Sequence, residues 1–252
     1  MLMIESYDVI FVIGCIGKIG SSIANTFIKY GVKVIGVDVV SETSEAVAQM
    51  QHGNFIYVQR QENYESLLDD FDLYAAKRGV GIINCAYPRI RGYGTSPEQM
   101  SYSEFGASVG LKLSNAFDLC MFAFRLSKLA DVPVSVVNFS SIYGIVAPRM
   151  GIYEGTKMNV PLDYSTAKAG IIAMTKHLHR EFGTPLLRFN VVSPGGIVED
   201  QPLSFQNSYS SFTSGNGLLE CSDLMGTVVF LCSDLSRKYG GHNFVVDEGF
   251  SL

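Results

Sequence analysis

Two segments of the chain place a tyrosine four residues before a lysine, at Tyr153–Lys157 and at Tyr164–Lys168. On a helix this spacing brings a phenol and an ammonium to one face. The ammonium stabilises the phenolate, which a general acid/base acting on an alcohol or a carbonyl requires. The segment YSTAKAGIIAMTKHLHREFG, which begins at Tyr164, has the pattern of a long amphipathic helix, whereas the other segment contains a glycine and soon meets Pro161. Tyr164 and Lys168 are therefore the predicted acid/base pair.

A glycine-rich turn lies near the N-terminus. Gly14, Gly17 and Gly20 form a GxxGxxG pattern directly after an apolar run, and such a turn lets the backbone approach a pyrophosphate at the start of a helix. Asp38 ends the next apolar run, where a carboxylate accepts hydrogen bonds from adenosine ribose hydroxyls and repels a 2′-phosphate. Lys18, inside the turn, acts against this preference because it attracts the same phosphate. The charges together favour NAD over NADP.

The composition excludes several classes of protein. The formal net charge is −5 and the 19 Lys and Arg residues are scattered, so we expect no nucleic acid and no membrane surface as a partner. No targeting or transmembrane segment is visible in the sequence. The five cysteines are an odd number without a CxxC pair, which fits a reducing compartment. We expect a cytoplasmic protein that acts on a small molecule without a bound metal.

Short β-branched runs alternate with helical segments along the whole chain. Several runs are apolar throughout, which is the pattern of parallel strands covered by helices on both faces. The sequence therefore predicts one α/β domain over residues 1–252, a single-domain doubly wound (Rossmann) fold with a seven-stranded, mostly parallel sheet and helices on both faces. The predicted strands are Asp8–Ile13, Val32–Val37, Phe55–Val58, Val80–Cys85, Val134–Phe139, Leu187–Ser193 and Asn243–Val246.

The helical segments have recognisable ends. Three predicted helices are each followed by a glycine, a common stop signal past a helix C-terminus. They are Lys18–Tyr30 before Gly31, Tyr64–Arg78 before Gly79, and Tyr164–Phe182 before Gly183.

A fourth predicted helix, Ser103–Ala130, is apolar on more than one face. One side of it should meet the sheet and another side a second subunit, so we predict a homodimer or a homotetramer. Two long segments have no assigned secondary structure, an insertion at 147–161 and a substrate loop at 197–220. Loops of this length in a compact domain are usually functional or mobile.

Several motifs follow one another in a fixed order: the glycine turn, Asp38, Asn84-Cys-Ala, VVNFSSIYG at 136–144, YSTAK, RFNVVSPGG at 188–196 and VVDEGFSL at 245–252. In this order they resemble the short-chain dehydrogenases/reductases over nearly the whole chain. The resemblance implies that Ser141 hydrogen-bonds the substrate oxygen, Tyr164 exchanges the proton and Lys168 holds the nicotinamide ribose. The cofactor-binding residues that it implies are Gly14, Gly17, Lys18, Ile19, Gly20, Asp38, Asn84, Ala86, Tyr164, Lys168, Pro194, Gly195 and Ile197.

Some positions depart from the family pattern. The GxxGxxG spacing is more typical of the longer, epimerase-like branch. The helix asparagine that completes the family's catalytic tetrad is replaced by Gly110, and the nearby Asn115 is the predicted substitute. Ser141 and Tyr164 are farther apart than usual because of the insertion. The insertion is similar to that of a bacterial subgroup found with flagellin or surface-polysaccharide sugar modification.

The predicted reaction is a hydride transfer between NAD(H) and a carbonyl or a secondary alcohol, with a sugar or sugar phosphate as candidate substrate. The loop after the fourth strand carries Arg89 and Arg91, which could hold a phosphate or carboxylate, or could be solvated charges only. We expect Tyr153 and Gly196 at the same polar or anionic substrate. A sugar-nucleotide epimerase or dehydratase that retains NAD, and a non-catalytic dinucleotide-binding regulator, remain alternatives.

Overall fold

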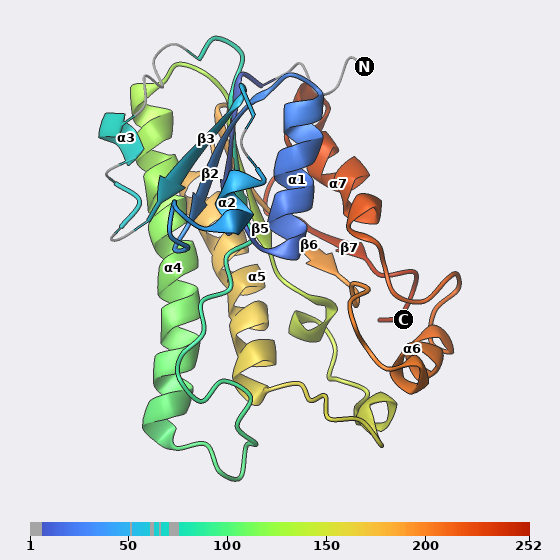
Figure 1. The fold of residues 1–252 in the computed structure, drawn as a ribbon. Coiled ribbons are helices and arrows are strands. Elements are labelled where there is room, and N and C mark those ends of the chain that lie inside the picture. The colour runs from blue at the N-terminus through green and yellow to red at the C-terminus, as the bar shows by residue number, and fades with distance from the viewer. Residues whose placement is uncertain (1–6, 51, 61–62, 66, 71–75) are drawn as a thin grey trace.

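The computed structural model describes residues 7–50, 52–60, 63–65, 67–70 and 76–252, and their centre is a seven-stranded sheet (Figure 1). The strand order is β3-β2-β1-β4-β5-β6-β7, and each neighbouring pair is parallel. The predicted Rossmann fold is confirmed, with a sheet that is parallel throughout. The strands are β1 (Val9–Ile13), β2 (Lys33–Asp38), β3 (Phe55–Gln59), β4 (Val80–Asn84), β5 (Val134–Phe139), β6 (Leu187–Pro194) and β7 (Asn243–Val246).

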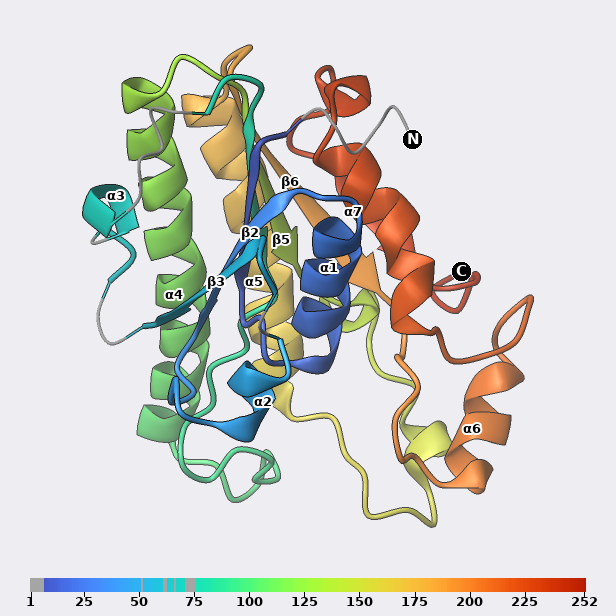
Figure 2. The same ribbon diagram turned by 45° about the horizontal axis from the view of Figure 1, so that its top comes forward.

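Helices cover both faces of this sheet (Figure 2). On one face, Ile23 and Phe27 of α1 pack in one apolar core with Val228 of α7, and on the other face Phe122 of α4 packs in a second core with Leu178 of α5. The helices are α1 (Lys18–Lys29), α2 (Glu45–Ala48), α3 (Leu67–Asp70), α4 (Tyr102–Leu129), α5 (Leu162–Phe182), α6 (Leu203–Ser210) and α7 (Met225–Leu231), with the short 3-10 helices η3 (Ile142–Gly144), η4 (Met150–Tyr153), η5 (Cys221–Leu224) and η6 (Asp234–Ser236).

Local sequence signals explain how the longest helix, α4, begins. Ser101 precedes it, and its hydroxyl accepts a hydrogen bond from the Glu104 N–H at 3.2 Å, while the Glu104 carboxylate accepts one from the Ser101 N–H at 2.8 Å. This reciprocal pair satisfies two N–H groups that a helix start otherwise leaves without partners. Farther along the helix, Leu111, Phe117 and Leu129 remain 41, 49 and 50% exposed. Among the described residues, no helix is long and apolar enough to cross a membrane.

Buried polar side chains link β4 and β5 to α5. The side-chain amide of Asn84 donates to Oδ1 of Asn138 at 3.0 Å, and the side-chain amide of Asn138 donates to the Thr175 hydroxyl at 3.0 Å. Asn84 also accepts a hydrogen bond from the Ala86 N–H at 3.3 Å. These bonds satisfy polar groups that would otherwise be costly to bury. They therefore fix the ends of two central strands relative to the helix that carries the predicted acid/base pair.

The helix predicted over Tyr64–Arg78 is wrong at its C-terminal end. The helix predicted over Tyr64–Arg78 is described only as α3, residues 66 and 71–75 lie outside the described residues, and the chain from Ala76 to Arg78 is not helical. The reason is Asp8, whose carboxylate accepts hydrogen bonds from the N–H groups of Lys77 and Arg78 at 2.7 and 2.6 Å.

The glycines past the helix ends also differ in their roles. Gly31 adopts φ +78° after α1, as a glycine stop requires. Gly183 has φ −61° after α5, a conformation open to other residues. A Cβ at Gly183 would lie 2.4 Å from the carbonyl oxygen of His179, so close packing explains this glycine.

The two segments that the sequence left without secondary structure both contain short helices. The insertion at 147–161 holds η4, and the segment at 197–220 holds α6. They share a small apolar cluster, separate from the two cores of the sheet, with the η3 turn and the C-terminal residues. Its buried members are Ile142, Ile152, Phe205, Tyr209 and Phe250.

Candidate active site

A cavity of about 390 Å³ opens at the carboxyl ends of β5 and β6, where ligands bind in sheets of this kind. Ser141, Tyr164 and Lys168 all line it. The cavity is also rich in aromatic side chains, because Tyr87, Tyr93, Tyr143 and Tyr153 line it as well. The predicted insertion and the predicted substrate loop both reach it, through Met158 to Pro161 and through Ile197 and Glu199.

The three polar residues of this cavity are held by neighbouring elements. Ser141 follows β5, and its hydroxyl hydrogen-bonds the Tyr164 phenol. Lys168 lies one turn after Tyr164 on α5, and its ammonium donates to the carbonyl oxygen of Phe139 at 2.9 Å. A Cβ at Gly144 would lie 2.8 Å from the Lys168 backbone, so the glycine lets η3 approach α5 closely. The backbone thus brings Ser141 to the phenol.

Burial sets the protonation of the pair. Desolvation lowers the pKa of Lys168 to about 8, so the ammonium remains largely charged at neutral pH. Desolvation raises the pKa of Tyr164 to about 12, and the hydrogen bond from Ser141 acts in the opposite direction. A protonated phenol beside a serine hydroxyl is suited to give a proton to a carbonyl oxygen. Proton removal from an alcohol needs additional positive charge at the site, since that charge favours the phenolate.

The second tyrosine–lysine pair is arranged differently. Tyr153 belongs to η4, and its hydroxyl lies 2.8 Å from that of Tyr143. Lys157 is exposed to solvent and does not line the cavity. Burial raises the pKa of Tyr153 above its ordinary value. Tyr153 therefore belongs to the wall of the cavity, whereas Lys157 does not.

The glycine turn has the properties of a dinucleotide site. Gly14 has φ +77°, and a Cβ there would lie 2.9 Å from the Ala86 backbone nitrogen. No side chain among the described residues caps the start of α1, which leaves its first N–H groups available to an anion. The Asp38 carboxylate accepts hydrogen bonds from the N–H groups of Ile16 and Val39 at 3.0 and 2.8 Å. These residues fit a bound dinucleotide.

The remaining residues of the predicted cofactor set have separate places. Gly14, Asp38 and Ala86 line a smaller cavity of about 130 Å³, whereas Ile19, Pro194, Gly195 and Ile197 line the larger one together with Gly196. Gly17 precedes α1, and Gly20 packs on the carbonyl oxygen of Gly14. The ammonium of Lys18 donates to the carbonyl oxygen of Val198, on the segment after β6.

Asn115 lies apart from the acid/base pair. It lines the smaller cavity with Asp38 and Arg60, and its side-chain oxygen accepts a hydrogen bond from the Tyr64 hydroxyl at 3.2 Å. The structure does not bring it to the cavity that Tyr164 and Lys168 line. The substitution of Asn115 for the family's relay asparagine thus finds no support in this arrangement.

The two loop arginines also separate. Arg89 lines the larger cavity, and its guanidinium carbon lies 4.8 Å from the centroid of the Tyr93 ring. Arg91 is exposed and lies outside the cavity lining. The sequence did not single out Asn159, whose amide donates to the carbonyl oxygen of Gly94 at 2.9 Å and so ties the insertion to the arginine loop. An isolated polar residue in a segment without predicted secondary structure gave no usable signal for this contact.

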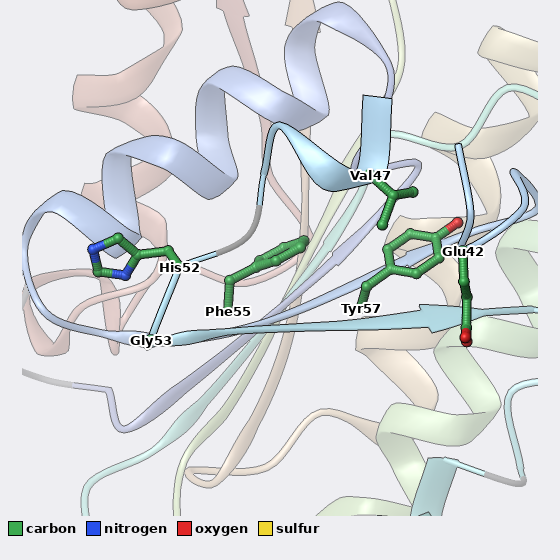
Figure 3. A pocket seen from close by; sticks show the side chains of 6 residues that line it. All are labelled: Glu42, Val47, His52, Gly53, Phe55 and Tyr57. Atoms are coloured by element: carbon green, nitrogen blue, oxygen red, sulfur yellow. The ribbon is translucent and has the colours of Figure 1, made fainter. Parts of the chain in front are cut away.

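Another cavity, of about 630 Å³, lies at the edge of the sheet beside β3 and α2 (Figure 3). Phe55 and Tyr57 of β3 line it with Val47 of α2 and with Glu42, His52 and Gly53. The Tyr57 hydroxyl donates to the carbonyl oxygen of Val40 at 2.5 Å. The strand order puts β2, β1 and β4 between this cavity and β5. It therefore contributes nothing to the acid/base site.

A parallel Rossmann sheet with a serine, a tyrosine and a lysine at its carboxyl edge defines an oxidoreductase that uses a nicotinamide cofactor. A family model described as "Enoyl-(Acyl carrier protein) reductase" matches residues 16–251. The chain belongs to the short-chain dehydrogenase/reductase family, as its motifs predict.

Curated relatives cover nearly the full chain. The chain is 28% identical over 260 residues to post-translational flagellin modification protein A of Campylobacter coli. The alignment covers 99% of this chain and 100% of the relative. It is 28% identical over 246 residues to a probable galactose dehydrogenase of Rhizobium meliloti, in an alignment that covers 92% of this chain and 90% of the relative.

Solved structures agree on the fold. A short-chain dehydrogenase from Leptospira borgpetersenii with bound NAD+ is 29% identical, with a TM-score of 0.79 over 97% of this chain and 93% of that one. A 4-hydroxyisoleucine dehydrogenase complexed with NADH is 23% identical, with a TM-score of 0.78 over 96% of this chain and 98% of that one, and at this identity it supports the fold alone.

Proposed function

We propose that this oxidoreductase transfers a hydride reversibly between NAD(H) and a carbonyl or secondary-alcohol carbon of a sugar-like substrate. The observation that carries the proposal is the common cavity of Ser141, Tyr164 and Lys168, with the open start of α1 close by through Ile19. We further propose that residues 1–252 form one catalytic domain. In this domain, the insertion at 147–161 and the loop at 197–220 form two sides of the substrate site.

The bound cofactor supplies or accepts the hydride, and the protein moves the proton. In the reducing direction, Ser141 holds the carbonyl oxygen and the Tyr164 phenol donates its proton to that oxygen. The reaction thus consumes one hydride and one proton for each carbonyl reduced to an alcohol. In the oxidising direction, Tyr164 removes the hydroxyl proton, with the charge of Lys168 favouring its phenolate. Lys168 and Tyr164 would also bind the nicotinamide ribose.

We propose NAD(H) as the cofactor. Asp38 supports this choice because its carboxylate is fixed by two N–H groups at the end of β2, where a 2′-phosphate would meet a negative charge. Lys18 acts against this choice because it keeps its charge, although its ammonium donates to the carbonyl oxygen of Val198, on the segment after β6. Arg60 lines the same small cavity but forms an ion pair with Asp118 at 3.3 Å. Its charge is therefore partly balanced within the protein.

The cavity supports a polyhydroxylated substrate that carries an anionic group. Its tyrosines offer hydroxyl groups and ring faces to a sugar, and Arg89 offers a guanidinium to a phosphate or carboxylate. Glu199, on the other bounding segment, can accept hydrogen bonds from hydroxyl groups. The name of one curated relative, a probable galactose dehydrogenase, points to carbohydrate chemistry as well.

The test is a coupled panel of sugars, sugar phosphates, nucleotide sugars and neutral alcohols, assayed with NADH, NADPH and their oxidised forms. We expect multiple turnovers with external NAD(H) on a charged sugar derivative. Turnover without external NAD(H) would favour an epimerase that retains its cofactor, and binding without turnover would favour a regulator. A hydrophobic, uncharged alcohol as best substrate would refute the substrate class.

The two loop arginines provide a matched pair for the same test. Arg89→Ala removes a guanidinium that lines the cavity, whereas Arg91→Ala removes one that is exposed outside it. Loss of a charged hydrogen bond to an anionic group costs about 1.5–3 kcal/mol, or about 10- to 150-fold in kcat/KM. We expect that loss for Arg89→Ala on a phosphorylated substrate and little change for Arg91→Ala. Equal kcat/KM values for both variants and the wild type would contradict the anion site.

A further inference from the structure

A buried ion pair joins α4 to α5 beside the candidate active site. Lys112 Nζ lies 2.9 Å from Asp163 Oδ2, and the two side chains are 2% and 1% exposed. Ser108, one turn before Lys112, donates its hydroxyl to the same carboxylate oxygen at 2.5 Å. Removing two charges from water is costly, and a well-packed apolar pair often stabilises a fold as well or better. Stability alone is therefore a weak explanation for this pair.

The ion pair is connected to the acid/base tyrosine in two ways. Asp163 is the residue directly before Tyr164 in the first turn of α5. Lys112 Nζ also lies 5.2 Å from the centroid of the Tyr87 ring, within the range of a cation–π contact. The Tyr87 ring meets the Tyr164 ring edge to face, with centroids 5.4 Å apart. A displacement of Lys112 would reach the phenol through both contacts.

The same aromatic ring lies between two ammonium groups. Lys168 Nζ is 5.3 Å from the centroid of Tyr87, nearly the same distance as Lys112 Nζ. The two cations are close enough that the charge of Lys112 lowers the pKa of Lys168, in addition to the larger effect of burial. The Cys85 thiol acts in the opposite direction. The phenols of Tyr87 and Tyr164 also face Lys168 and are protonated near pH 8, because burial raises the pKa of each.

We propose that Lys112 is a positioning residue, which fixes the Tyr164 phenol through Asp163 and the Tyr87 ring and contributes its charge to the field at Lys168. The inference rests on the proposed function, since Lys112 acts only through Tyr164 and Lys168. Lys112 needs no contact with the substrate. It lies two residues after Gly110, on the helix where the family pattern has its tetrad asparagine.

The two partners of the ion pair predict opposite changes at Lys168. Lys112→Met removes a positive charge near Lys168, so the pKa of Lys168 should rise above about 8. Asp163→Asn removes a negative charge and leaves Lys112 in place, so the same pKa should fall. Both variants break the same ion pair, and a purely structural role would give both the same effect. The sign of the shift therefore separates electrostatic positioning from packing.

We would measure this shift in two ways. The first is the alkaline limb of kcat for carbonyl reduction, and the second is an NMR titration of ¹⁵N-labelled Lys168 Nζ, assigned by its loss in Lys168→Met. We also expect Lys112→Met to lower kcat by about tenfold, the scale of a small misplacement of a catalytic group, with the KM for NADH unchanged. The NMR titration needs no substrate, so it tests the role of Lys112 even if the wild type shows no turnover. Absence of turnover would refute the proposed function alone.

Matched variants separate the effect of the Lys112 charge from that of its packing. Lys112→Arg keeps the charge and should keep the alkaline limb of the wild-type kcat profile. Lys128→Met removes an exposed lysine of the same helix, 5.1 Å from the Phe124 ring, and should leave kcat unchanged. If a single variant fails to fold, Lys112→Met with Asp163→Leu removes both buried charges at once and avoids an unpaired one. We expect this double variant to fold and to show the tenfold lower kcat.

Two results would overturn the inference. One is a Lys168 titration that stays in place, or moves in the same direction, in Lys112→Met and Asp163→Asn. The other is a folded double variant with the kcat and alkaline limb of the wild type. Either result would leave the ion pair as a packing feature only.

Discussion

The replacement of Tyr164 by phenylalanine is the most direct test of the acid/base assignment. The change removes one hydroxyl and keeps the ring, so the edge-to-face contact with Tyr87 at 5.4 Å is retained. Loss of a general acid/base lowers kcat by at least about 100-fold, which corresponds to about 2.7 kcal/mol in the activation free energy. The hydroxyl interacts with Ser141, and the loss of a hydrogen bond of this kind should change the free energy of unfolding by no more than about 1.5 kcal/mol.

Tyr153→Phe is the matched control for this variant. Tyr153 lines the same cavity and also loses one hydroxyl, but that hydroxyl is bonded to Tyr143 at 2.8 Å, and Lys157, the lysine of its pair, is exposed outside the cavity. We expect its kcat to fall by less than about tenfold, since no proton transfer is lost. The assay is steady-state hydride transfer followed by NADH absorbance, with Tm and NADH affinity measured for each variant.

The dependence on pH adds a second criterion. Wild-type alcohol oxidation should accelerate as pH rises toward about 8, because only the phenolate removes the hydroxyl proton and Lys168 still carries the charge that favours it in this range. Tyr164→Phe should lose this acceleration and Tyr153→Phe should keep it. A larger loss of kcat in Tyr153→Phe than in Tyr164→Phe would refute the choice between the two pairs.

Three further predictions concern the cofactor, the assembly and stability. The wild type should prefer NADH to NADPH in kcat/KM, and Asp38→Ala should narrow that difference by removing repulsion of the 2′-phosphate; equal wild-type values would contradict it. Light scattering should give a molar mass of two or four times 27.6 kDa, because Leu111 and Phe117 of α4 are exposed apolar residues that a second subunit can cover. A monomer at micromolar concentration would count against a homodimer or homotetramer. Burial and the nearby charge of His242 lower the pKa of His179, so its contribution to Tm should be fully present above about pH 6.5 and decrease as pH falls below it, a slope that His179→Gln should flatten.

The strands could be predicted from the sequence because burial on both faces gives a simple pattern. The apolar run at Val134–Phe139 matches β5, which is buried throughout, at both ends. The run at Asn243–Val246 also matches its strand, β7, at both ends, although this edge strand is partly exposed. The helix predicted from Ser103 differs from α4 by one residue at each end. The predicted helix ending at Arg78 was wrong because Asp8, far away in sequence, binds the backbone there. A contact of this range leaves no local signal.

In the candidate site, too, features with a local sequence signal could be predicted and the others could not. Ser141, Tyr164 and Lys168 belong to short motifs with fixed spacing, so their meeting in one cavity could be predicted. Helix α6 was missed, although Pro202 and the buried pair Phe205 and Tyr209 at i, i+4 would have indicated it.

The placement of Asn115 and the role of Lys112 depend on which face of α4 meets which neighbour. Both residues lie on a helix that is apolar on several sides, with Asn115 at the smaller cavity and Lys112 on Asp163. The periodicity of such a helix does not distinguish these faces.

The small apolar cluster around Phe250 has a consequence for how the protein is made. Synthesis proceeds from the N-terminus, so Tyr164, Lys168 and strands β1 to β6 leave the ribosome before Phe250 is translated. Phe250 stacks on Tyr209 at 4.3 Å and is fully buried, so α6 and the insertion cannot complete their common packing until it arrives. The nascent chain therefore holds Tyr164 and Lys168 before the segments at 147–161 and 197–220 can complete their packing.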